Sequence, residues 1–154
     1  MSVAFRRESD EEHLEPKFEL PLPAGPNLVT ERGRSLIAAK VAELESAIAA
    51  EQDDEARNVL KRQLRYWHTR AATAEVVAPP QGDVVGIGSR VRIRLAGKER
   101  VIDVVGHDEA DPAADRIAFQ APLARALIGA EVGEKVDFNG KAEAIEILET
   151  TPIP

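Results

Sequence analysis

The chain has 154 residues, of which 44% are hydrophobic and 31% charged, an ordinary composition for one globular domain or two small ones. Its formal net charge is −7, with 11 basic and 14 acidic residues before Pro80 and 9 basic and 13 acidic residues after it. Bulk charge therefore excludes a basic duplex-binding module, and any DNA or RNA binding must come from a local patch.

Residues 1–29 are predicted to form an extended N-terminal arm. Four prolines and Gly25 fall between residues 16 and 26, and proline fixes φ while removing a backbone donor. Phe18, Leu20 and Leu22 alternate, which would allow one short segment to pack on the body. The favoured interpretation is a mobile tail, because disorder concentrates at chain termini.

Residues 30–76 are predicted to form an antiparallel coiled-coil hairpin, with Thr30 as the N-cap of its first helix. Apolar residues recur at alternating spacings of four and three, the pattern of a coiled-coil seam, in two runs: Ile37, Val41, Leu44 and Ile48, then Leu60, Leu64, Trp67, Ala71 and Ala74. A turn near residues 51–54 lets the two seams bury each other. A single continuous helix is the alternative, but the acidic run at the turn would interrupt its seam. Two helices of about 20 residues would make a hairpin roughly 30 Å long.

After a linker at 77–82, the hydrophobic period changes to two, and residues 83–150 are predicted to form a small β domain. The expected strands are 90–95, 99–105, 116–120, 135–138 and 142–148. Pro122 and Gly129 bound a short helix, and Asn139-Gly140 is a favoured hairpin turn. The predicted class is therefore α+β: a helical hairpin followed by an antiparallel sheet with one short helix.

Several kinds of site are excluded by the residue types present. The sequence has no cysteine, which excludes disulfides and thiolate nucleophiles. His13, His68 and His107 lie far apart in the sequence, so zinc chemistry is not expected. No apolar stretch reaches about 18 residues and no signal-peptide core is present, so we expect a cytoplasmic protein with no membrane contact.

Acidic residues gather at the predicted tip of the hairpin: Glu51, Asp53, Asp54 and Glu55. One interpretation is that Asp53 or Asp54 caps the second helix and complements its dipole. The other is that the two aspartates supply oxygen ligands to Mg²⁺, which usually takes only one or two protein carboxylates. The two roles are compatible.

Basic residues form two further patterns. Arg57, Lys61 and Arg65 are spaced four apart and so share one face of the second helix. This stripe is either a solvated face or a surface that steers an RNA 3′ end. The arginines at 90, 92 and 94 point to one side of a strand, which indicates the wet side of a sheet or protection of an edge.

Two segments resemble the signature of the C-terminal domain of Gre-type transcription elongation factors. Asp108-Glu-Ala-Asp111 matches the family's acidic segment, and Pro122-Leu-Ala-Arg-Ala-Leu-Ile-Gly129 matches its short helix. Arg65-Tyr-Trp67 and 74–77 also resemble the end of the family's second hairpin helix. The resemblance is strongest from about Ser89 to Leu148.

The resemblance implies a C-terminal domain with the fold of the FKBP prolyl isomerases that binds bacterial RNA polymerase. It implies that the hairpin enters the secondary channel, where acidic tip residues help to hold a magnesium ion and the polymerase cleaves its own backtracked transcript. The chain would not be an enzyme and would have no cofactor of its own, with Mg²⁺ present only in the complex. If the two hairpin seams pack within one chain, the protein should be a monomer. The residues implied in polymerase binding are Asp108, Glu109, Asp111, Pro122, Leu123 and Arg125.

The hairpin departs from the family pattern. Typical members have helices several turns longer and a tip that resembles Gly-Asp-x-x-Glu-Asn, whereas this tip is Glu51-Gln-Asp-Asp-Glu-Ala-Arg-Asn58. A non-cleaving polymerase binder that competes with cleavage factors is therefore the alternative function. A prolyl isomerase and an oligomeric coiled-coil adaptor are two further hypotheses; the former is weakened because residues 81–154 contain only Phe119 and Phe138 as aromatic residues.

Overall fold

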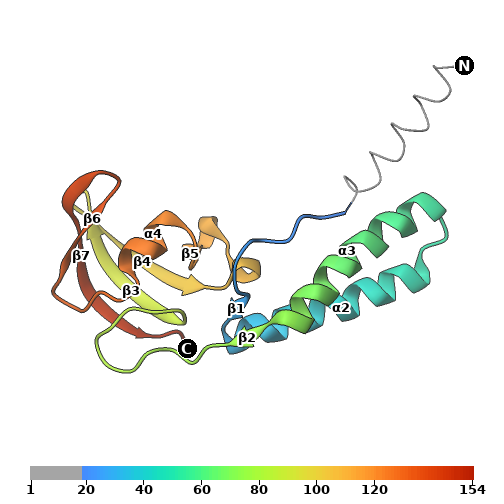
Figure 1. Cartoon of the computed structure of the whole chain (residues 1–154), viewed down its shortest axis with the longest axis horizontal. Helices are drawn as coiled ribbons and strands as arrows, with labels where there is room; N and C mark the ends of the chain where they lie inside the picture. The colour runs from blue at the N-terminus through green and yellow to red at the C-terminus, as the bar shows by residue number, and fades with distance from the viewer. Residues whose placement is uncertain (1–18) are drawn as a thin grey trace, which may run out of the picture. The chain divides into compact units, whose positions relative to one another are not determined.

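The computed structural model describes residues 19–154, which form two compact units (Figure 1). The hairpin unit contains residues 19–25 and 37–73, and the β unit contains residues 26–36 and 74–154. The first turns of the first hairpin helix therefore group with the β unit. Among the described residues, no helix is both long and apolar enough to cross a membrane.

Two helices of 20 residues each, α2 (Glu31–Ala50) and α3 (Asp54–Thr73), confirm the predicted hairpin and its turn. Ile37 and Leu44 of the first predicted seam are 1% and 3% exposed, because the apolar faces of an antiparallel pair bury each other. Trp67 of the second seam is half-buried, and its ring meets that of Tyr66 edge-on at 5.1 Å between centroids. Ala71, which we predicted to lie on the seam, is exposed.

A two-stranded parallel sheet joins the start and the end of the hairpin. Strand β1 (Leu28–Val29) pairs with β2 (Glu75–Val76), and the N–H of Val77 donates to the carbonyl oxygen of Val29 at 2.8 Å. The predicted arm 1–29 therefore contains a strand that the sequence pattern did not indicate. Leu20 and Leu22 are 44% and 52% exposed, so the alternating segment is not buried there, while residues 1–18, including Phe18, lie outside the described part.

The main sheet has five strands in the order β5-β4-β3-β7-β6. Their bounds are β3 (Ser89–Leu95), β4 (Lys98–Val105), β5 (Arg116–Ala118), β6 (Lys135–Phe138) and β7 (Lys141–Pro152). The sheet is mixed and not purely antiparallel as predicted, because β5 runs parallel to β4. The connection between them contains two short 3₁₀ turns, η2 (His107–Glu109) and η3 (Pro112–Ala114), which return the chain to the same end of the sheet. Strand β7 also extends past the predicted domain end at 150.

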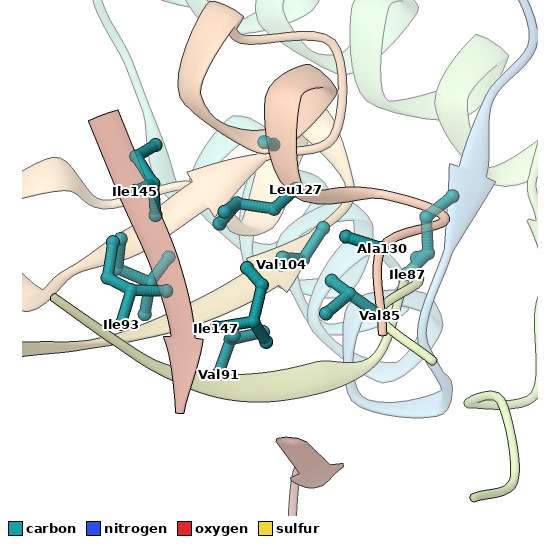
Figure 2. Packing of buried hydrophobic residues seen from close by; sticks show 11 residues of the cluster. Val85, Ile87, Val91, Ile93, Val104, Leu127, Ala130, Ile145 and Ile147 are labelled. Carbon is teal, nitrogen blue, oxygen red and sulfur yellow. The ribbon is translucent and has the colours of Figure 1, made fainter. Parts of the chain in front are cut away.

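The core of the β unit lies between the sheet and helix α4 (Pro122–Leu127). Figure 2 shows side chains of β3, β4, β7 and α4 pointing toward one another. Val91, Ile93, Ile145, Ile147 and Leu127 are each 0% exposed. The alternation of the strands buries one face, and Pro122 and Gly129 bound the helix as predicted, with Gly129 at a φ of 88°.

The other face of β3 carries a ladder of charge pairs. Arg90 donates to both carboxylate oxygens of Asp103 at 2.8 and 3.0 Å. Arg92 pairs with Glu99, and Arg94 pairs with Glu146, each at 3.0 Å. The hydrogen bonds that Arg90 donates to Asp103 and Arg92 donates to Glu99 raise the pKa of each arginine above its usual value. Because β3 is a central strand, these arginines do not protect an edge.

The hairpin turns of the sheet need left-handed backbone. Asn139 and Gly140 have φ of 54° and 80°, which confirms the predicted turn. The β3–β4 turn places Ala96 at φ 54° before Gly97 at 77°. An alanine in this region is strained by about 1–2 kcal/mol, whereas asparagine tolerates it.

We expect Ala96→Asn to increase the free energy of unfolding of the protein by about 0.5–1 kcal/mol, because it relieves this strain. Urea unfolding followed by circular dichroism measures the change. Ala142→Asn is the control, since Ala142 is exposed on strand β7, where asparagine is disfavoured. Equal effects of the two substitutions would contradict the explanation.

Candidate functional site

The hairpin tip is a short turn between α2 and α3, held by its own acidic residues. The Glu51 carboxylate accepts the N–H groups of Gln52 and Asp53 at 3.2 and 3.1 Å. Asp53 Oδ2 accepts the N–H of Ala56 at 2.9 Å, the bond expected of a residue that caps α3. The capping interpretation is therefore confirmed for Asp53.

Asp54 differs from Asp53 in its surroundings. Its side chain is 93% exposed and contacts Arg57 at 3.3 Å. Arg57 also donates to the carbonyl oxygen of Glu51, so one guanidinium links the end of α2 to the start of α3. Glu55 is exposed at the same end of the hairpin.

The tip carboxylates do not form a group of three or more metal ligands. Among residues 19–154, no group of three or more histidine, aspartate or glutamate side chains is placed to bind a metal ion. Asp53 uses one oxygen for capping, and Asp54 is exposed but close to a guanidinium. Because Mg²⁺ often takes one or two protein carboxylates, these residues fit a role as additional ligands to an ion held mainly by another molecule.

The predicted basic stripe on α3 is partly engaged within the hairpin unit. Arg65 donates to both carboxylate oxygens of Glu19, at 3.1 and 2.7 Å. This hydrogen bonding lowers the pKa of Glu19 and raises that of Arg65. Arg57 belongs to the tip, and Lys61 is exposed between the two. The three cations therefore share one helix face, but two of them already bind carboxylates.

The predicted docking residues lie in two parts of the β unit. Asp108 and Glu109 belong to η2, and Asp111 follows them directly before η3. Asp111 is exposed and Asp108 partly exposed, whereas Glu109 is 5% exposed. The acidic segment therefore has an exposed Asp111, a half-buried Asp108 and a buried Glu109.

The short helix α4 supplies the remaining docking candidates. Pro122 and Arg125 are exposed, whereas Leu123 is partly buried against the core. Pro122 and Arg125 line a shallow surface hollow with Asp137, Phe138 and Asn139. This hollow combines apolar and charged walls.

Sequence reasoning missed what Glu109 contacts. Its carboxylate accepts the Thr30 N–H at 3.2 Å, the Thr30 hydroxyl at 2.5 Å and the Gly106 N–H at 3.1 Å. All of these residues belong to the β unit. A cavity of about 320 Å³ lies beside them and is lined in part by Thr30, Val105 and Glu109.

We expect Asp53→Ala to lower the free energy of unfolding by about 1 kcal/mol, because the variant loses the cap of α3. Asp54→Ala should change it by less than about 0.5 kcal/mol, since this side chain is almost fully exposed. Urea unfolding followed by the helical circular dichroism signal measures both. Asp53→Asn should keep most of the stability, and a larger loss for Asp54→Ala than for Asp53→Ala would contradict the assignment of the cap.

The second half of the chain is similar to proteins of a known family. Residues 79–152 match the family described as "Transcription elongation factor, GreA/GreB, C-term". Transcription elongation factor GreA of Rhizobium etli is 38% identical over 86 residues, which cover 52% of this chain and 54% of the relative. GreA of Agrobacterium fabrum is 39% identical over 83 residues, which cover 50% of this chain and 52% of the relative. The chain thus spans about half the length of the curated relatives it matches.

Solved structures with some likeness to this chain include two whose names refer to GreA. GreA factor homolog 1 of Thermus thermophilus has 16% identity and a TM-score of 0.38, covering 82% of this chain and 99% of that chain. The elongation factor GreA/GreB of Nitrosomonas europaea has 22% identity and a TM-score of 0.40, covering 83% of this chain and 99% of that chain.

Proposed function

We propose that this chain belongs to the Gre-type family through its C-terminal region and is a transcription elongation factor that binds bacterial RNA polymerase at the secondary channel. The match over residues 79–152 supports this proposal most directly. The chain would work in the cytoplasm as a monomer. It would not be an enzyme, because any transcript cleavage would be chemistry of the polymerase.

The β unit would supply the docking surface. The carboxylates of the exposed Asp111 and the half-buried Asp108 suit a basic element of the polymerase. Pro122 and Arg125 of α4 would add an apolar contact and a cation that can pair with a carboxylate. Leu123 would act by holding α4 on the core, because it packs against that core.

The hairpin tip would promote cleavage of backtracked transcripts. When bound in the complex, magnesium supplies positive charge that stabilises the developing negative charge at the cleaved phosphate. Asp54 would approach the ion site most easily, because its carboxylate is almost fully exposed. Asp53 would hold the tip in shape through its cap, and Glu51 would do so through the turn. Lys61 would face the phosphates of the transcript 3′ end.

A second candidate function is competition without cleavage. Helices of 20 residues make a hairpin of roughly 30 Å, shorter than the family pattern described above. The Asp54 carboxylate at the tip is also partly neutralised by Arg57. Such a hairpin would occupy the channel and exclude a cleavage factor without completing the site.

The deciding experiment uses a backtracked polymerase complex with end-labelled RNA in Mg²⁺. Cleavage stimulation predicts rapid transcript shortening with the wild-type chain and its loss in Asp54→Asn, which should leave stability unchanged. Ser46→Asn, at an exposed position about one turn before the end of α2, is a control for a substitution that removes no carboxylate. Absence of shortening, together with inhibition of a known cleavage factor, would instead establish competition. Absence of both, with no detectable binding, would contradict the family-based proposal.

A further inference from the structure

The N-terminus of helix α2 is capped from a distant part of the chain. Thr30 is its N-cap, because its hydroxyl oxygen accepts the Gly33 N–H at 3.0 Å and its carbonyl oxygen accepts the Arg34 N–H. A complete capping box needs a glutamate or glutamine at the third helical position, which would accept the N–H of the cap residue. That position is Gly33, which has no side chain to do so.

Glu109 supplies the missing carboxylate from 79 residues away in sequence. It accepts the Thr30 N–H, as the glutamate of a capping box would, and it also accepts the Thr30 hydroxyl. Its position beside the first turn of α2 places negative charge at the positive end of the helix dipole. The same carboxylate accepts the Gly106 N–H, which closes the 3₁₀ turn η2.

Gly33 also leaves the space that Glu109 fills. A Cβ atom built on Gly33 would lie 2.3 Å from Glu109 Oε2, far closer than real contacts allow. Glycine has a low helix propensity, and here it stands at the point where the Glu109 side chain approaches the helix. Gly106 is equally confined, because its Cβ would lie 2.6 Å from the carbonyl oxygen of Leu28.

From these contacts we propose that Glu109 is a positioning residue that holds the first turn of α2 in the β unit and thereby limits how freely the hairpin moves. Within Asp108-Glu-Ala-Asp111, the two aspartates would serve the partner, while the glutamate between them serves the hairpin. This inference goes beyond the proposed function and concerns the free protein. It can therefore be tested without polymerase, and its failure would be distinguishable from failure of the proposed function.

The first measurement is amide hydrogen exchange of the full chain. Glu109→Ala should accelerate exchange of the Thr30 and Gly106 amides about fivefold to tenfold, because it removes their acceptor. The amides of Val91 and Ile93 in the sheet core should keep their exchange rates. A general loss of stability would accelerate exchange at these amides as well. The cavity beside Thr30 and Glu109 can admit water to the released donors, so we expect the variant to remain folded.

The second measurement uses the absence of cysteine in the chain. Spin labels at Asn58→Cys and Glu131→Cys, both exposed, report the distribution of distances between the hairpin unit and the β unit. Glu109→Ala should broaden that distribution, and Gly33→Ala should do the same by displacing the carboxylate. Thr30→Val, which lacks the hydroxyl, should also broaden the distance distribution. Thr30→Ser, which keeps the hydroxyl, should leave it as narrow as that of the wild type. Glu143→Ala is the matched loss of an exposed glutamate and should leave the distribution unchanged.

Two results would overturn the proposal. One is unchanged exchange at Thr30 and Gly106 in Glu109→Ala. The other is faster exchange at these amides with a distance distribution as narrow as that of the wild type. In the latter case Glu109 would only cap the helix and would not position the hairpin.

Discussion

Leu127→Ala is expected to lower the free energy of unfolding of the β unit by about 2–5 kcal/mol, the usual cost of removing a buried leucine side chain. Leu127 is 0% exposed and is the last residue of α4, packed against the core cluster of β3, β4 and β7. A domain of this size has a total stability of about 5–15 kcal/mol, so this single change removes a large share of it.

The neighbouring Ile128 provides the control, because it is 39% exposed directly after the helix. Ile128→Ala should cost less than about 1 kcal/mol. Urea unfolding, followed by near-ultraviolet and far-ultraviolet circular dichroism, measures the free energy of unfolding of both variants. Similar costs for the two substitutions would show that α4 is not anchored through Leu127, and the burial shown in Figure 2 would then not describe the protein in solution.

The hairpin could be predicted from the sequence because its determinants are local. Thr30 and Asp53 are cap residues at the two helix starts, and the acidic run between the seams marks the turn. Each signal lies within a few residues of the element it defines. The exposed Ala71 shows the limit of the method, since a small apolar residue fits a seam pattern whether or not a partner reaches it.

Contacts between distant segments were beyond sequence reasoning. The parallel pairing of β1 with β2 joins two strands of two residues each, and two residues have no readable period. The direction of β5 depends on the two 3₁₀ turns before it, whose local pattern indicated only a loop. The mixed sheet is the consequence.

The candidate site was predictable as a set of residues but not as a set of roles. Four acids at the tip and three in the docking segment could be named from residue type and spacing. Only coordinates show that Asp53 is used for capping while Asp54 is exposed, and that Glu109 turns inward while Asp111 faces outward. The third helical position of α2 is Gly33, so the capping box lacks its own glutamate, which is a local signal for an acceptor from a distant segment. The sequence did not indicate which of the 27 aspartates and glutamates would be that acceptor.

Reversing charge on the docking segment should have the largest effect on partner binding. If Asp108 and Asp111 meet a basic element of RNA polymerase, Asp108→Arg with Asp111→Arg places like charges together. We expect the affinity for polymerase to fall at least about tenfold, equivalent to ~1.4 kcal/mol, with a lower association rate. Binding of the labelled chain to core polymerase, measured by fluorescence anisotropy and stopped flow, gives both values.

The ionic strength dependence identifies the cause. The affinity of the wild-type chain should fall as salt rises from about 0.05 M to about 0.3 M, whereas that of the double variant should fall less, because screening then weakens a repulsion. Asp83→Arg is a control for charge, since Asp83 is exposed in the same unit but outside the docking segment. If Asp83→Arg lowered the affinity as much as each substitution of the double variant does on average, only the net charge would matter. The docking segment would then have no specific role in binding. If the double variant bound as tightly as the wild type, the β unit would have to dock through α4 alone, with Arg125 as its charged contact.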